Sequence, residues 1–136
     1  MELREAEPGD SDGIREVAHA SLHDTYDDIL GEETVEKAVG RLYDPDQLPA
    51  EVDSDELEFV VADDDGVVGF AQVHQREDQR DGRIQWLHVH PGRRGEGIGA
   101  RLLEHARDLM RARGMERVTA AVLADHLEGN EFYREH

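Results

Sequence analysis

The sequence predicts one domain of mixed α and β structure, in which a mostly antiparallel sheet is flanked by helices. Several short segments alternate polar and apolar residues, which is the period of a half-buried strand. Longer segments repeat apolar residues three and four apart, as amphipathic helices do. The chain of 136 residues contains no linker, internal repeat or low-complexity tract, so we expect residues 1–136 to fold as a single domain.

The first half of the chain is predicted to contain one strand and two helices. Pro8-Gly9 ends the strand, and Asp10 offers an N-cap for the first helix. The polar run 23–28 is interpreted as a break between the helices. The expected elements are a strand over 2–6, a helix from 10 to 22, a helix from 31 to 42, and a loop with one helical turn over 47–56.

The second half is predicted to contain most of the sheet. Two Asp-Gly pairs, Asp65-Gly66 and Asp81-Gly82, favour hairpin turns, and Gly114 favours a helix end. The expected elements are strands over 57–62, 67–74, 83–89 and 116–123, a helix from 98 to 113, and a last helix that begins near Asp125. The resulting order is β-α-α-β-β-β-α-β-α.

The composition excludes several classes of function. Asp and Glu number 33 against 15 basic residues, and a net charge of −18 repels nucleic acid and anionic membranes. With no cysteine there is no disulfide, zinc-thiolate site or cysteine nucleophile. The N-terminus lacks the apolar run of a signal peptide, so we expect a cytoplasmic protein. Lys37 is the one lysine, and an acidic chain that keeps arginine but loses lysine indicates a halophilic source.

The most informative stretch is the glycine-rich segment that follows the strand over 83–89. Gly95, Gly97 and Gly99 stand at alternate positions, immediately before a predicted helix. Glycines let a ligand approach the backbone, and the first N–H groups of a helix have no partner within the helix. With the helix dipole, these groups form a site for a phosphate or pyrophosphate, to which Arg93 and Arg94 add charge.

The spacing of the segment distinguishes among known phosphate loops. The dinucleotide pattern G-x-G-x-x-G does not fit, and no Lys-Ser/Thr follows the glycines as in a nucleotide P-loop. The pattern present is Arg94-x-x-Gly97-x-Gly99, after a strand that ends Leu-x-Val-x-Pro. It resembles the coenzyme A pyrophosphate loop of the GNAT superfamily, the acetyl-CoA-dependent N-acetyltransferases, and the order of elements is also similar to the GNAT fold.

The resemblance implies acetyl-CoA as co-substrate, held by two segments. The backbone from Arg94 to Ala100 would bind the pyrophosphate, and the preceding strand would pair with the pantetheine arm. The family's asparagine position is a histidine here, so His126, Asn130 or neither of them would contact the pantetheine. The expected cofactor-binding residues are Leu87, His88, Val89, Arg94, Gly95, Glu96, Gly97, Ile98, Gly99, Ala100, His126, Asn130 and Tyr133.

The resemblance also implies a reaction. A primary amine, on a small molecule or a peptide N-terminus, would attack the thioester directly in a ternary complex. Tyr133, in the Phe-Tyr pair of the last helix, would protonate the departing thiolate. The strand before the glycines carries no carboxylate to act as base, so His88 and His74 are the candidate bases, each with a structural role as the alternative. We expect no metal, because His88-x-His90 lacks a third ligand.

Three further expectations concern the acceptor, the completion of the sheet and the alternative classes of function. The acceptor is expected near the acidic run 23–28. The family normally adds strands after the last helix, so either the sequence is cut short here or the sheet is completed otherwise, as by a second copy in a homodimer. The alternatives to an enzyme of this family are a non-catalytic acyl-CoA-binding or regulatory module on the same fold, and a nucleotide-binding enzyme that uses the loop for ATP or NAD.

Overall fold

The computed structural model of the chain describes residues 1–53, 57–76 and 80–120. The last predicted helix lies outside these residues, and so do three of the predicted site residues, His126, Asn130 and Tyr133. The described elements are β1 (Glu2–Glu5), the short 3-10 helix η1 (Pro8–Asp10), α1 (Ser11–Leu30), α2 (Glu32–Leu42), α3 (Leu48–Val52), β2 (Leu57–Asp63), β3 (Val67–Arg76), β4 (Asp81–Val89), η3 (Pro91–Arg93), α4 (Ile98–Ala112) and β5 (Arg117–Ala120).

The five described strands form one sheet in the order β1-β2-β3-β4-β5. The first four are antiparallel neighbours, and β5 pairs parallel to β4, with Asp81 opposite Arg117 and Ile84 opposite Ala120. A parallel neighbour requires a crossover connection, which α4 supplies. The predicted fold class, a mostly antiparallel mixed sheet flanked by helices, is therefore confirmed for this part of the chain.

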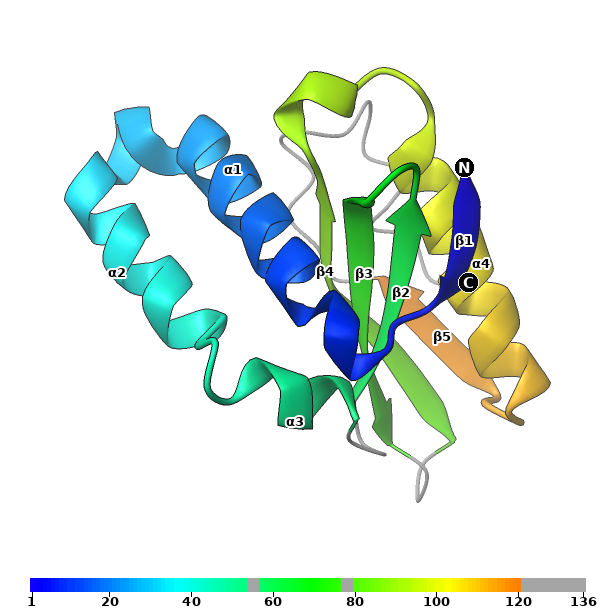
Figure 1. Cartoon of the computed structure of the whole chain (residues 1–136). Helices are drawn as coiled ribbons and strands as arrows, with labels where there is room; N and C mark the ends of the chain where they lie inside the picture. Colours follow the sequence, from blue (N-terminus) through cyan, green and yellow to red (C-terminus); the bar gives the residue numbers. More distant parts are fainter. Residues whose placement is uncertain (54–56, 77–79, 121–136) are drawn as a thin grey trace.

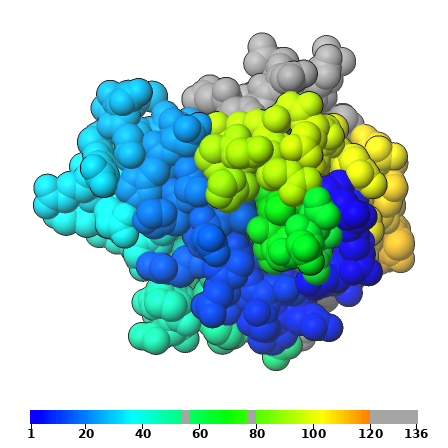
Figure 2. Space-filling model, turned by 45° about the horizontal axis from the view of Figure 1, so that its top comes forward, coloured from blue at the N-terminus to red at the C-terminus, as the bar shows by residue number. Residues whose placement is uncertain are grey.

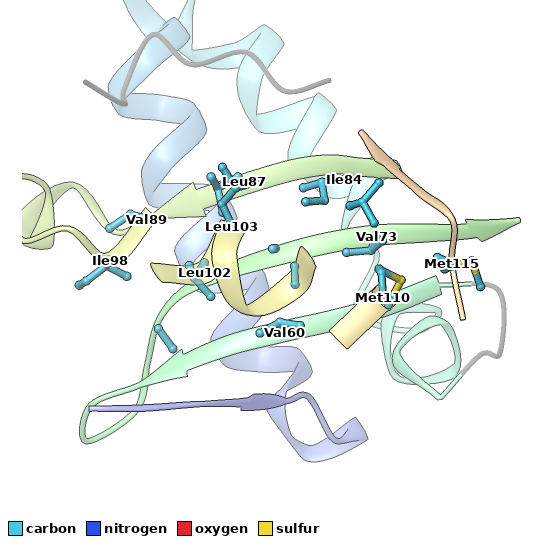
Figure 3. Packing of buried hydrophobic residues seen from close by; sticks show 14 residues of the cluster. Val60, Val73, Ile84, Leu87, Val89, Ile98, Leu102, Leu103, Met110 and Met115 are labelled. Carbon is cyan, nitrogen blue, oxygen red and sulfur yellow. The ribbon is translucent and has the colours of Figure 1, made fainter. Parts of the chain in front are cut away.

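Helices cover both faces of the sheet (Figure 1). On one face, α1 and α3 pack on the strands and α2 packs against α1, around a core that includes Ile14, Val39, Tyr43, Phe59 and Phe70. On the other face, α4 packs on the strands around a core that includes Val60, Val73, Ile84, Leu102 and Met110 (Figure 3). None of the helices in the described segments has the length and apolar character needed to cross a membrane.

One prediction for the first half is wrong. The polar run 23–28 does not break the helix, because α1 continues to Leu30. Its buried face ends at Leu22, so the apolar periodicity stops before the helix does. Hydrogen bonds between side chains support the extension, since His23 Nδ1 lies 2.7 Å from Asp27 Oδ1 one turn further on. The helix ends instead at Gly31, whose φ of 89° suits glycine.

The predicted hairpin turn at Asp81-Gly82 is also wrong. Both residues are buried within β4 and pair with Arg76 and Gln75 of β3. Gly82 allows close packing of α4, because a Cβ there would lie 3.0 Å from Met110 Cγ and would displace that side chain. The left-handed residue at this end of the hairpin is Arg80, with φ of 49°. The glycine of this Asp-Gly pair therefore lies where α4 packs closely on β4, and not in a turn.

An arginine joins the edge strand β1 to the start of α1. The Arg4 guanidinium donates to both carboxylate oxygens of Asp10, at 2.7 and 2.9 Å, and to Asp63 Oδ2 of β2 at 3.0 Å. Asp10 also accepts the N–H of Glu7 at 2.8 Å. Hydrogen bonds from Arg4 lower the pKa of Asp10 below its usual value. A carboxyl group with a lowered folded-state pKa stabilises the fold above its unfolded pKa.

We predict that Arg4→Gln lowers the free energy of unfolding by about 1–2 kcal/mol at pH 6 through the lost pairing with Asp10. The difference from the unchanged chain should shrink as pH falls below about 4, because the carboxylate is then protonated in the unfolded chain and progressively in the folded one. Urea unfolding at pH 6, 4 and 3 measures it.

Lys37→Gln is the matched control, since Lys37 and its partner Glu33 are 75% and 89% exposed and 3.8 Å apart. This variant should change stability little at any pH. An Arg4→Gln effect that persists unchanged at pH 3 would contradict the assignment.

Candidate functional site

The glycine-rich segment forms a strand–turn–helix unit at the end of β4. After Val89 the backbone N–H of His90 still donates to Val68 O of β3, at 2.8 Å, and Pro91 opens η3. Gly95 and Gly97 then take φ values of 83° and 80°. A Cβ at either position would meet nothing within 4 Å, so the backbone conformation and not crowding requires glycine there. The two glycines turn the chain directly into α4.

The N-terminus of α4 is unusually free of negative charge for this chain. Its first intrahelical bond runs from Arg101 N to Gly97 O, at 3.1 Å, so the preceding N–H groups have no acceptor within the helix. No side chain of the described residues caps this end, and the first turn holds no acidic residue. By contrast, Asp12 lies in the first turn of α1, and Glu32 and Glu33 lie in that of α2. The α4 terminus is therefore suited to an anion.

The two arginines of the turn, expected to add charge for a phosphate, both bind carboxylates in the structure. Arg93 donates to Asp64 Oδ2 at 2.7 Å and to Glu96 Oε1 at 3.0 Å. These bonds hold the turn against the β2–β3 hairpin that carries Asp64. They also offset the charge of Glu96, which directly precedes Gly97.

Arg94 links the turn to α1. Its guanidinium donates to the Asp24 carboxylate and, at 3.3 Å, to Ser21 Oγ. Its Nε is buried and has no hydrogen-bond partner within residues 1–53, 57–76 and 80–120. Figure 2 shows the residues of the turn, in yellow-green, lying against the blue α1. Ser21 and Asp24 are thus brought to the turn by α1, although neither was predicted as a site residue.

His88, a predicted base and cofactor-binding residue, lies buried beneath this contact. Only 4% of it is exposed, and its Nδ1 lies 3.1 Å from Ser21 Oγ. Its ring stacks on Trp86 at 5.6 Å between centroids, with Phe70 at 5.4 Å and Tyr43 edge-on at 6.4 Å. An imidazole, a serine and an arginine therefore form a chain of polar groups from the buried β4 to the surface of α1. Ser21 is a polar residue on the mostly apolar buried face of α1, and this pattern is the feature of the sequence that could have identified it as a site residue.

The other predicted residues divide into two groups. Leu87, Val89, Ile98 and Gly99 are buried, whereas Gly95, Glu96, Gly97 and Ala100 are exposed along the turn. His74, the second candidate base, pairs with Arg83 on β4, six residues or about 20 Å of strand from Val89. His90 accepts the Gly92 N–H through Nδ1 at 3.1 Å. The structure therefore brings His88, but neither His74 nor the ring of His90, into contact with Ser21.

The fold and the turn together define a class of protein. It is a mixed α/β domain in which a strand, a glycine turn and a helix N-terminus form a unit suited to a phosphate-bearing ligand. The particular family follows from comparison with known proteins. The model of the acetyltransferase (GNAT) family matches residues 20–136, and the chain belongs to this family.

Two curated relatives are also acetyltransferases by name. The chain is 34% identical over 108 residues to the streptothricin acetyltransferase of Streptomyces lavendulae, covering 78% of this chain and 51% of that protein. It is 35% identical over 78 residues to the mycothiol acetyltransferase of Beutenbergia cavernae, covering 57% of this chain and 26% of that protein. The chain thus spans about half the length of the first relative and about a quarter of the second.

Solved structures of the family share the fold. The PaiA N-acetyltransferase of Thermoplasma acidophilum, determined in complex with coenzyme A, aligns with a TM-score of 0.82 and 24% identity, covering 93% of this chain and 81% of that chain. A GCN5-related N-acetyltransferase of Rhodopseudomonas palustris aligns with a TM-score of 0.72 and 27% identity, covering 92% and 74% respectively. The expected GNAT fold is therefore confirmed.

We predict that Gly97→Ala destabilises the chain by about 1 kcal/mol, because an alanine Cβ disfavours the left-handed backbone of that position. The control is Gly40→Ala in α2, where a Cβ would also meet nothing within 4 Å but φ is not positive. It should stabilise by about 0.5–1 kcal/mol, as alanine does within helices. Equilibrium urea unfolding compares the two, and effects of equal sign would contradict the conformational argument.

Proposed function

We propose that the protein is an N-acetyltransferase that transfers an acetyl group from acetyl-CoA to a primary amine. One observation carries the proposal. In a chain of the GNAT family with 33 acidic residues, the first N–H groups of α4 have no acceptor within the helix, and its first turn holds no carboxylate. That terminus matches the chemistry of the coenzyme's pyrophosphate.

Two backbone segments would hold the co-substrate. The N–H groups from Arg94 to Ala100 would bind the pyrophosphate, and Leu87, His88 and Val89 on β4 would pair with the pantetheine. The N–H near Val89 would polarise the thioester carbonyl. His126 or Asn130, both outside the described residues, would contact the pantetheine. Support comes from the geometry of the turn and from the family, in which the PaiA protein was solved with coenzyme A.

The proposed reaction is a direct transfer in a ternary complex. The neutral amine nitrogen attacks the thioester carbonyl carbon, an N–C bond forms, and the C–S bond breaks. Tyr133, also outside the described residues, would give its hydroxyl proton to the departing thiolate. The attacking nitrogen must lose a proton, and this requires a base.

We assign the base to His88, with Ser21 as its positioning partner. Arg94 can only donate, so Ser21 Oγ acts as an acceptor in that contact, at 3.3 Å. The second lone pair of this oxygen can accept a hydrogen from His88 Nδ1, 3.1 Å away. His88 would then keep Nε2, which is buried in the structure, as the proton-accepting nitrogen. This arrangement uses the buried contact between α1 and β4 and needs no carboxylate on the strand.

The acceptor class proposed is a small-molecule amine or a peptide N-terminal amine. Its support is the family and the acetyltransferase relatives. The second half of α1 carries Asp24, which binds Arg94 of the turn, together with Asp27 and Asp28, and their charge would attract a cationic amine. We further propose that the acidic surface is an adaptation to salt, since screening relieves the repulsion among carboxylates. Assays therefore belong in molar salt.

Ligand-induced stabilisation tests the proposed co-substrate. In molar salt, acetyl-CoA and coenzyme A at 100-fold over their dissociation constants should stabilise the native chain by about 2.7 kcal/mol. ATP and NAD at the same concentrations should give smaller shifts. Thermal unfolding with each ligand measures this. A folded sample with no shift from either coenzyme form would refute the proposed site, and a larger shift from ATP or NAD would favour a nucleotide enzyme.

The second prediction tests the proton transfers. His88→Gln should lower kcat/KM about 100-fold and remove the acidic limb of its pH profile, whereas Tyr133→Phe should remove the basic limb. Ser21→Ala should shift the acidic limb with a smaller loss. Thiol release with a panel of amines gives the rates. If His74→Gln removes the acidic limb instead, the base assignment is wrong. If acetyl-CoA binds but no amine is acetylated, the chain is a non-catalytic acyl-CoA-binding module.

A further inference from the structure

A cluster of metal-ligating side chains joins α1 to α2, on the face of α1 away from the sheet. We propose that His19, His23 and Glu36 form a zinc site that ties these two helices together. The proposal is independent of acetyl transfer and goes beyond it. It departs from the sequence-based expectation of no metal, which weighed His88 and His90 only.

The three side chains converge on one point. His19 and His23 lie one turn apart on α1, with ring centroids 4.4 Å from each other. Glu36 reaches across from α2, and its Oε2 lies 2.9 Å from His19 Nε2 and 2.8 Å from His23 Nε2. One potential ligand atom from each residue therefore falls within 4.8 Å of the other two.

These ligand types and separations suit Zn²⁺. Zinc takes imidazole nitrogen and carboxylate oxygen at about 2.0–2.2 Å, which in a tetrahedron places ligand atoms about 3.3 Å apart. The two nitrogen–oxygen separations of 2.9 and 2.8 Å need to lengthen by only about 0.4–0.5 Å. Glu36 can supply the movement, because its side chain is 56% exposed. Two imidazoles also favour zinc over Mg²⁺ or Ca²⁺, which select oxygen ligands.

Asp27 provides the support that metal-binding histidines generally have. Its Oδ1 lies 2.7 Å from His23 Nδ1, on the ring nitrogen opposite the cluster. A carboxylate at this nitrogen fixes the ring so that Nε2 faces the metal and makes that nitrogen a better ligand. His23 is also the most enclosed of the three, with its side chain 14% exposed. The ring is thus already held in a ligating orientation.

Hydrogen bonds to Glu36, in addition to the packing of α2 on α1, hold His19 and His23 together with it. The helices are held by buried apolar residues, including Val17, Val35 and Val39. Side-chain pairs as exposed as His19 and Glu36, at 44% and 56%, stabilise a fold little on their own. A metal ion bound by all three side chains would fix α2 against α1, the helix that carries Ser21 and Asp24.

The experiment uses the full chain in molar NaCl, with ZnCl₂ in calorimetric titration and CoCl₂ as a spectroscopic probe. We expect one ion per chain, a d–d absorption typical of tetrahedral cobalt, and a higher unfolding temperature with Zn²⁺. His19→Asn and Glu36→Gln should each weaken Zn²⁺ binding at least tenfold. Asp27→Asn should weaken it by about 10- to 100-fold without removing a ligand.

The matched control is His105→Asn on α4, a half-buried histidine on another helix. It should leave zinc affinity and the cobalt spectrum unchanged. Circular dichroism without metal verifies that each variant is folded. We expect the His19 and Glu36 variants to fold, because these side chains are 44% and 56% exposed. The proposal is overturned if the unchanged chain binds no stoichiometric zinc, if His19→Asn behaves like His105→Asn, or if excess Mg²⁺ displaces the ion.

Discussion

The burial of the apolar face of α4 against the sheet determines the rest of the structure. Leu102 and Met110 pack on β3 and β4, where Gly69 and Gly82 leave room for them. With α4 held there, β5 must run parallel to β4, and the N-terminus of α4 must lie beside the end of that strand. The short connection then has to turn sharply, which explains the positive φ at Gly95 and Gly97. A helix end with the geometry suited to an anion thus follows from core packing.

In a chain with a net charge of −18, the surroundings of that helix end hold little unpaired negative charge. The first turn of α4 holds no carboxylate, and Glu96 is paired with Arg93. Arg94 is paired in the same way with Asp24, and this pairing brings α1 to the turn. Arg93 and Arg94 therefore connect the turn to neighbouring elements, the β2–β3 hairpin and α1, in addition to carrying charge.

Two faces of α1 carry the side chains of the two proposed sites. Its buried face places Ser21 against His88, so a polar contact crosses the apolar core between helix and sheet. Its outer face places His19 and His23 opposite Glu36 of α2. The proposed zinc site and the proposed proton-transfer site thus share one helix. The long, uninterrupted α1 is what makes this arrangement available.

The sequence alone determined the fold class, most strands, the glycine turn and the start of α4, because periodicity and positive-φ glycines are local properties of the chain. It failed where local signals were ambiguous. The polar run 23–28 hid the second half of α1, and with it the one-turn spacing of His19 and His23; Gly82 indicated a turn but serves helix packing. Only the tertiary structure decided that Ser21 meets His88, 67 residues away, and that Glu36 meets two histidines of another helix. Such contacts depend on how helices dock on the sheet, and no short-range pattern encodes that geometry.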